Sequence, residues 1–215
     1  MIRGDKMINT LRSMITDVIP DVWPVIIIIT VIACTLRIAY LINNKISFCF
    51  YKELFTLVFI LYVMCLFEVV TLQDNNYGLS NFIPFREIFR YAIGSPLFIK
   101  NIIGNILLFL PYGYFIGYYI NNKKIWSAAV LTMIISITIE IVQLNIGRIF
   151  DIDDVILNTC GGVLGFLIYT VSEGISNYLP KVFKTEGFIN FLVIFILILV
   201  IVFLFNINVL GWFNS

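Results

Sequence analysis

The sequence contains no histidine. Histidine is the commonest general base and a common transition-metal ligand, so its absence removes most of that chemistry. Charged residues make up only 13% of the 215 residues, and the net charge is +1. This balance gives no indication of nucleic-acid binding. The four cysteines are scattered without a CxxC pair, and most of them lie in apolar runs, where a free cysteine acts as a small apolar residue.

Long apolar runs are abundant. Hydrophobic residues make up 60% of the chain, and the mean hydropathy is +1.00. A helix needs roughly twenty consecutive apolar residues to cross a bilayer. Six segments meet this requirement: 23–42, 53–73, 100–120, 125–145, 154–173 and 188–210. The sequence therefore predicts an all-α fold, a polytopic transmembrane helix bundle with about six spans.

The first 22 residues form a different kind of segment. Apolar residues such as Met7, Leu11 and Ile15 fall on one helical face, and polar residues take the other. This pattern predicts an amphipathic helix in the membrane interface, with Pro20 and Pro24 turning the chain into the first span. The predicted division of the chain is 1–22 (interfacial helix), 23–75 (two spans), 76–172 (core with three spans and a polar loop) and 173–215 (linker and last span).

Six spans place alternate connections on opposite membrane faces. Segments 74–99 and 146–153 share one face, and segments 43–52, 121–124 and 174–187 share the other. The short basic loop "NNKK" at 121–124 favours the cytoplasmic side for that second face. Loop 146–153 is therefore predicted to be extracellular. Arg37, near the end of the first span, is expected to extend to the interface.

Polar residues occur where the spans meet the first face. Most form pairs spaced by three or four residues, which share one side of a helix. The spans contribute Asn101, Asn105, Glu140, Gln143, Asp154 and Asn158, and the loop adds Arg148, Asp151 and Asp153. Glycines 161, 162 and 165 permit a close helix neighbour, and Pro111 interrupts the third span. These features predict a polar pocket at one face of the bundle.

Three motifs carry a resemblance to a known family. They are "NIIGNILLFLPYGYFIG", "IEIVQLNIGR" and "FDIDDVILNTCGGVLGF". Together they resemble the VanZ-like family of bacterial membrane proteins over about residues 80–170. The matching positions are Asn101, Asn105, Leu108, Phe109, Pro111, Gly113, Glu140, Gln143, Gly147, Arg148, Asp151, Asp154, Asn158 and Gly161. The resemblance implies a multi-pass protein of the bacterial cell membrane with a role in tolerance of glycopeptide antibiotics, teicoplanin above all. It supplies no established catalytic residue.

The polar residues admit several roles. They can hold the helices together by hydrogen bonds. Alternatively, Arg148 can bind a phosphate or carboxylate, with Asn101, Asn105 and Gln143 as further donors. Glu140, Asp151 and Asp154 are candidate acid–base residues, and Asp151, Asp153 and Asp154 are weaker candidates for holding Mg²⁺ or Ca²⁺. No cofactor is firmly implied.

We favour a non-enzymatic envelope protein. Its expected partners are the lipid bilayer and a lipid-linked cell-wall precursor, a glycopeptide or a membrane protein, without nucleic acid; the oligomeric state is left open. An enzyme acting on an envelope lipid is the alternative, although the chain has no histidine and no serine or cysteine nucleophile motif. A small transporter comes third, because no inverted repeat is evident.

Overall fold

The computed structural model describes residues 2–72, 80–120 and 124–213, and for residues 2–22, 69–72, 201 and 203–213 it describes the helical backbone without the side chains. The described chain is helical apart from its connections, which confirms the predicted all-α class. In chain order the elements are α1 (Ile2–Asn43), α2 (Phe50–Leu72), α3 (Arg86–Arg90), α4 (Pro96–Phe98), the π-helix η1 (Ile99–Ile103), α5 (Gly104–Tyr119), α6 (Ile125–Asn145), α7 (Ile152–Tyr178), the 3₁₀-helix η2 (Lys181–Lys184) and α8 (Glu186–Phe213).

Within the described residues, five helical segments are long and apolar enough to cross a membrane. They are Trp23–Asn43, Phe50–Glu68, Pro96–Tyr119, Ile125–Asn145 and Ile152–Tyr178. These correspond to the first five predicted spans, with ends shifted by a few residues. The sixth predicted span falls on α8, which is 28 residues long and whose described apolar part is Glu186–Val200.

The N-terminal segment continues directly into the first span. Helix α1 is continuous from Ile2 to Asn43, so Pro20 and Pro24 lie inside a helix and no non-helical segment separates residues 2–22 from the first span. The predicted apolar face of this segment involves the side chains of residues 1–22, which lie outside the described part of the chain. The amphipathic character of the segment stays a prediction.

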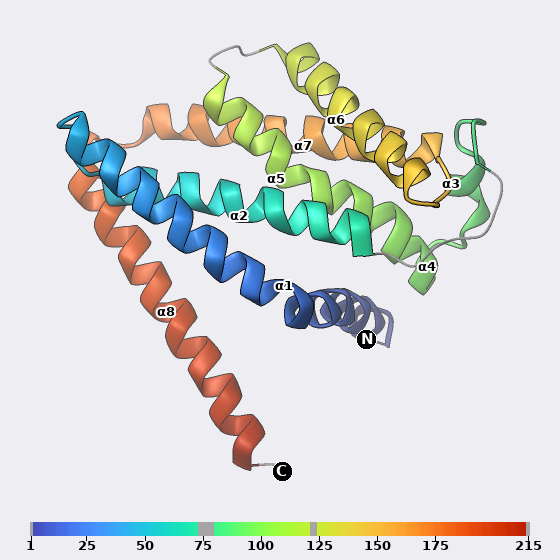
Figure 1. The fold of residues 1–215 in the computed structure, drawn as a ribbon, viewed down its shortest axis with the longest axis horizontal. Coiled ribbons are helices and arrows are strands. Elements are labelled where there is room, and N and C mark those ends of the chain that lie inside the picture. The colour runs from blue at the N-terminus through green and yellow to red at the C-terminus, as the bar shows by residue number, and fades with distance from the viewer. Residues whose placement is uncertain (1, 73–79, 121–123, 214–215) are drawn as a thin grey trace.

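Helices α5 and α7 form the centre of the bundle. Figure 1 shows α5 crossing α7, with α6 on one side and α2 on the other; α1 in turn packs against α2. Glycines let the two backbones touch: a Cβ added to Gly113 would lie 1.8 Å from the carbonyl oxygen of Gly162, and one added to Gly165 would lie 1.9 Å from that of Leu110. Small residues at four-residue spacing allow such close packing between membrane helices.

Pro111 lies inside α5, between Leu110 and Gly113, which both touch α7. Proline has no N–H group, so one carbonyl in the preceding turn loses its helical partner. In the same turn, the Tyr62 hydroxyl of α2 donates a hydrogen bond to the carbonyl oxygen of Leu108 at 2.8 Å. A polar side chain from α2 thus meets the backbone where the helix is interrupted, as expected for an interruption within a membrane.

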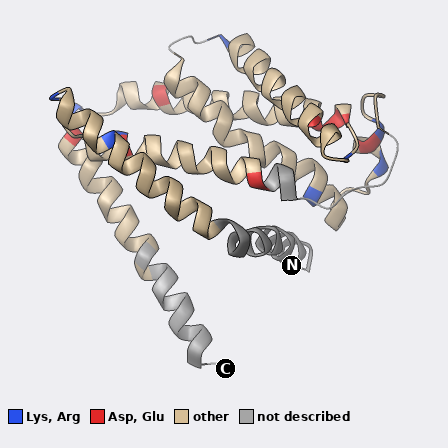
Figure 2. Cartoon of the chain, viewed as in Figure 1, with Lys and Arg blue, Asp and Glu red and all other residues tan. Residues whose placement is uncertain are grey.

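The charged residues gather towards the two ends of the helices (Figure 2). At one end, segment 43–52 meets segment 174–190 through the ion pair of Lys52 Nζ and Glu186 Oε1, at 2.7 Å, and a bond from the Tyr51 N–H to Asn190 Oδ1, at 2.9 Å. At the other end, the residues after position 80 contact the loop between α6 and α7, where Asn81 pairs with Asp151. The described connections are therefore distributed between the ends as the alternating course predicts.

The contact between α5 and α7 yields a stability prediction. Gly165→Ala places a methyl group against the backbone of Leu110, and we expect it to destabilise the protein by about 2 kcal/mol or more. Gly174→Ala, in the same helix, is the matched control because nothing lies within 4 Å of its added Cβ. Thermal unfolding of both purified variants measures the effect, and equal melting temperatures would contradict the close packing.

Candidate functional site

The loop between α6 and α7 begins with a glycine turn. Gly147 has φ +89°, a left-handed conformation that favours glycine. The N–H group of Arg148 donates to the carbonyl oxygen of Gln143 at 2.9 Å, and that of Gly147 donates to Leu144 at 3.3 Å. These bonds satisfy carbonyls in the last turn of α6. The turn then directs the chain back toward α7.

Asp151 ends the loop and begins α7. Its carboxylate oxygen Oδ1 accepts from the N–H of Asp153 at 2.9 Å, so Asp151 is the N-cap of the helix. The same oxygen accepts from Asn81 Nδ2 at 2.9 Å. The Asp151 N–H donates to Glu140 Oε2 at 2.9 Å. Asp151 therefore joins α6, α7 and the segment that precedes α3.

Asn81 holds the loop from the other side and is 4% exposed. Its N–H donates to the carbonyl oxygen of Phe150 at 2.8 Å, and its own carbonyl accepts from Ile152 at 3.0 Å. Together with the bond to Asp151, these contacts give the loop three consecutive residues with fixed partners. The loop is consequently attached to the segment that precedes α3.

Glu140, Gln143 and Arg148 meet at the end of α6. Glu140 is 2% exposed and Gln143 is 6% exposed. When the Gln143 amide is oriented by its hydrogen bonds, its nitrogen donates to Glu140 Oε1 at 3.0 Å and its oxygen accepts from Arg148 Nη1. The glutamine thus links the carboxylate to the guanidinium.

Asn105 of α5 and Asp154 of α7 complete the group. Asn105 Nδ2 donates to Asp154 Oδ1 at 2.5 Å. Asp154 also lies within electrostatic range of Glu140, Asp151 and Arg148. We call the six residues Asn105, Glu140, Gln143, Arg148, Asp151 and Asp154 the polar cluster. Six of the eight predicted ligand-binding residues are therefore brought together by three helices and one loop.

Asp151 is the carboxyl group of the polar cluster that lies in the loop. Burial raises the pKa of Asp151, because the charged form of a carboxyl group is disfavoured in a poorly hydrated site. Hydrogen bonds from Asp153 and Asn81 act in the opposite direction, because they stabilise the carboxylate. Asp151 is therefore held in its place by donors aimed at its charged form.

Asp153 has another role, although it directly precedes Asp154. It is 1% exposed, and its carboxylate accepts hydrogen bonds from three backbone N–H groups around the start of α3: those of Phe85, of Glu87 at 2.7 Å and of Ile88 at 3.3 Å. Phe85 has φ +67°, an unfavourable conformation for a bulky residue. Asp153 stabilises this turn from a distant helix and caps α3.

The carboxylates suggested as metal ligands have partners within the protein. Among the described residues, no group of three or more histidine, cysteine, aspartate or glutamate side chains is placed to hold an ion. Asp151 and Asp153 accept bonds from the protein itself. The Mg²⁺ or Ca²⁺ site suggested at Asp151, Asp153 and Asp154 gains no support from these contacts.

Asn101 and Asn158 lie outside the polar cluster. Asn101 Nδ2 donates to the Tyr91 hydroxyl at 2.8 Å, and that hydroxyl in turn lies 3.3 Å from Glu87 Oε2. Burial raises the pKa of Tyr91, so the hydroxyl keeps its proton. Asn158 Nδ2 donates to Ser136 Oγ at 2.9 Å, one turn deeper in the bundle than Asp154. Asn101 was expected to share one helix face with Asn105. It does not, because it lies in the π-helix, whose wider turn shifts residues four positions apart off a common face.

The sequence did not predict four buried or partly buried polar residues at or near these networks: Asn81, Tyr91, Thr132 and Ser136. Thr132 and Ser136 precede Glu140 by eight and four positions, so a polar row at helical spacing was present in the sequence. Asn81 carried no such signal, because its partner Asp151 is 70 positions away along the chain. Tyr91 carried none because its partners, Glu87 and Asn101, lie in the short α3 and the π-helix and not on one long helix.

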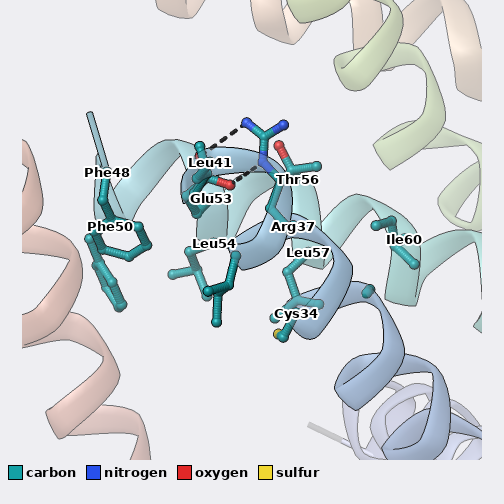
Figure 3. A pocket seen from close by; sticks show the side chains of 12 residues that line it. Cys34, Arg37, Leu41, Phe48, Phe50, Glu53, Leu54, Thr56, Leu57 and Ile60 are labelled. Atoms are coloured by element: carbon teal, nitrogen blue, oxygen red, sulfur yellow. Dashed lines mark hydrogen bonds and ion pairs between the residues drawn. The ribbon is translucent and has the colours of Figure 1, made fainter. Parts of the chain in front are cut away.

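A separate hollow lies at the opposite end of the bundle, between α1 and α2 (Figure 3). Its volume is about 290 Å³, and most of its lining is apolar. At its edge Arg37 forms a two-pronged ion pair with Glu53, with Nε–Oε2 at 2.7 Å and Nη2–Oε1 at 3.1 Å. Arg37 is thus paired across two helices, which sequence reasoning did not anticipate. None of the predicted ligand-binding residues lines this hollow.

The contacts of Asp153 yield a prediction about α3. Asp153→Ala removes the acceptor of three backbone N–H groups, and we expect a loss of about 1–3 kcal/mol with loosening of segment 82–95. Trypsin should then cleave after Arg86 or Arg90 sooner than in the parent protein. Glu173→Gln, near the far end of α7, is the control. Equal cleavage rates in Asp153→Ala and the parent would refute this role.

Comparison with known proteins places these features in a family. The profile of the family described as VanZ/LLP1 matches residues 53–173, so the match includes most of α2 and extends beyond the motifs of residues 80–170. The chain is 29% identical over 154 residues to the protein named "Protein VanZ" of Enterococcus faecium, which covers 70% of this chain and 86% of that relative. No solved structure shows a significant match. The matched segment contains the whole polar cluster and is more than half of the chain, and the chain belongs to the VanZ/LLP1 family.

Proposed function

We propose that this envelope protein lowers the sensitivity of the cell to glycopeptide antibiotics, teicoplanin above all, and that the polar cluster carries this function by binding a ligand. The observation that supports the proposal most is the extent of the family match, which spans every residue of the polar cluster. The role itself is the one implied by the resemblance to VanZ-like proteins.

The proposed ligand is an anionic group carried by a lipid, such as the phosphates of a lipid-linked cell-wall precursor. Arg148 lies half-buried at the rim of the polar cluster, beside the exposed residues 145–147. A guanidinium binds phosphate or carboxylate through parallel hydrogen bonds. Arg148 is therefore the residue of the polar cluster best suited to contact an anion.

The surroundings of the polar cluster favour a ligand that arrives within the membrane. Segment 82–97, at the same end, exposes large apolar side chains, including Phe82 (70%), Phe89 (84%) and Ile93 (78%). Arg86 and Lys100 are exposed beside them. Apolar and basic residues in one short segment are typical of contact with the headgroup region of a bilayer. A lipid-linked ligand fits this setting better than a soluble one.

We also propose that the polar cluster faces the exterior, because the short basic loop 121–124 at the opposite end favours the cytoplasm. Single cysteines at positions 145 and 45, both exposed, in a variant without native cysteines, test this orientation. We expect a membrane-impermeant thiol reagent to label position 145 in intact cells and position 45 only after permeabilisation. The reverse pattern would place the polar cluster in the cytoplasm.

The resistance proposal predicts a dependence on Arg148. In a susceptible Gram-positive host, expression of the parent protein should raise the inhibitory concentration of teicoplanin, with vancomycin measured in parallel. Arg148→Ala should return it to the level of the empty vector, because loss of a charged hydrogen-bonding partner costs about 2–5 kcal/mol of binding.

Lys181→Ala is the matched control, since Lys181 is an exposed cation outside the polar cluster. Membrane abundance of every variant is measured by immunoblot. If the parent protein leaves both sensitivities unchanged, the resistance function is wrong for this chain; if Arg148→Ala retains full resistance at equal abundance, the arginine is not the ligand-binding residue.

An enzyme acting on an envelope lipid is the second candidate, and the proximity of Asp154 to Glu140 is the observation that favours it. Two neighbouring carboxyl groups can share acid–base work. In the same assay, Asp154→Asn abolishes resistance if Asp154 transfers a proton. Partial resistance at equal abundance instead supports binding, because asparagine keeps an oxygen that can accept from Asn105.

A further inference from the structure

The buried face of α6 is polar along most of its length. Its buried residues are Ala128, Thr132, Ser136, Glu140 and Gln143, which follow one another at four- or three-residue spacing. Thr132 and Ser136 are 0% exposed. With a rise of about 1.5 Å per residue, Thr132 lies about 12 Å from Glu140 along the helix. A polar row therefore extends from the polar cluster toward the interior of the membrane.

Two buried atoms, one in this row and one facing it from α7, have no hydrogen-bond partner among the described residues: Thr132 Oγ1 and Asn158 Oδ1. Asn158 is 4% exposed, and its amide nitrogen already donates to Ser136 Oγ. Buried polar atoms without a partner are rare in native proteins, and a water molecule is a common reason for those that occur. Inside a membrane the cost of leaving such atoms unpaired is high.

The direction of the Thr132 hydroxyl is unusual. Other buried or half-buried threonines of the helices, such as Thr159 and Thr170, donate back to the carbonyl four residues earlier. Thr132 Oγ1 instead points at α7, only 2.2 Å from the place where a Cβ of Gly162 would lie. The glycine makes room for the hydroxyl between the two helices.

The two unpartnered atoms lie on adjacent turns of one interface. Asn158 precedes Gly162 by four residues in α7, and Thr132 precedes Ser136 by four residues in α6. Side chains at this spacing have Cβ atoms about 5–6 Å apart. One water molecule bridges acceptors at such a separation and commonly makes about three hydrogen bonds in a buried site.

We propose that a water molecule binds between α6 and α7, donating its hydrogens to Thr132 Oγ1 and Asn158 Oδ1. The Ser136 hydroxyl, which accepts from Asn158, can rotate to donate to the same water. The site continues the polar cluster inward by two turns of α6. The row of polar residues thus holds a solvent molecule deep in the span. This proposal does not depend on whether the polar cluster binds a ligand.

Thermal stability tests this site with a matched pair of substitutions. Thr132→Val keeps the shape of the side chain and removes the hydroxyl. If the water is bound in the parent protein, Thr132→Val breaks the bridge between residue 132 and Asn158. We then expect the melting temperature to fall by about 2–4 °C. Thr138→Val is the control, because Thr138 is exposed on the same helix and bonds back to Ile134. An unchanged or raised melting temperature for Thr132→Val would overturn the proposal, since deleting an unpaired hydroxyl costs nothing.

Water-edited solid-state NMR of the labelled protein in liposomes provides an independent measurement. Magnetisation from water should reach the Asn158 side-chain amide and the Thr132 side chain of the parent protein, and Thr132→Val should weaken the transfer to Asn158. Absence of transfer at both positions in the folded parent would also overturn the proposal, whatever the behaviour of the valine variant.

Discussion

The backbone contact between α5 and α7 determines where the polar residues of this protein meet. Gly113 and Gly165 bring the two helices closer than any larger residue allows. At that separation Asn105 reaches Asp154. Gly162 has no side chain, which leaves space for Thr132 of α6 beside α7. The glycines therefore set the distances between three polar helix faces, although they contribute no hydrogen-bonding side chain themselves.

The concentration of acids around the start of α7 has a largely structural explanation. Asp151 and Asp153 accept hydrogen bonds from backbone N–H groups at the starts of two different helices. A carboxylate at such a position satisfies donors that would otherwise need water, and it interacts favourably with the helix dipole. The acids that are close together in the sequence thus cap two helices that begin far apart along the chain.

The sequence predicted the spans, their order and the common end of the polar pairs, because apolar length and the alternation of faces depend on local information. It also predicted that Glu140, Arg148 and Asp154 would meet. It did not predict that Asp153 caps α3 or that Asn81 holds the loop, since both contacts join residues more than 60 positions apart. The different partner of Asn101 depends on a π-helix, which four-residue spacing does not reveal. Local patterns thus located the site, whereas its division into separate networks required the three-dimensional structure.

The ion pair between Arg37 and Glu53 bears on how the chain enters the bilayer. Each residue belongs to a different span, and only six residues separate α1 from α2. A lone arginine or glutamate is costly within a lipid environment, whereas a paired arginine and glutamate carry no net charge. The first two helices therefore have reason to insert together, as a hairpin whose opposite charges have already met before either helix is surrounded by lipid.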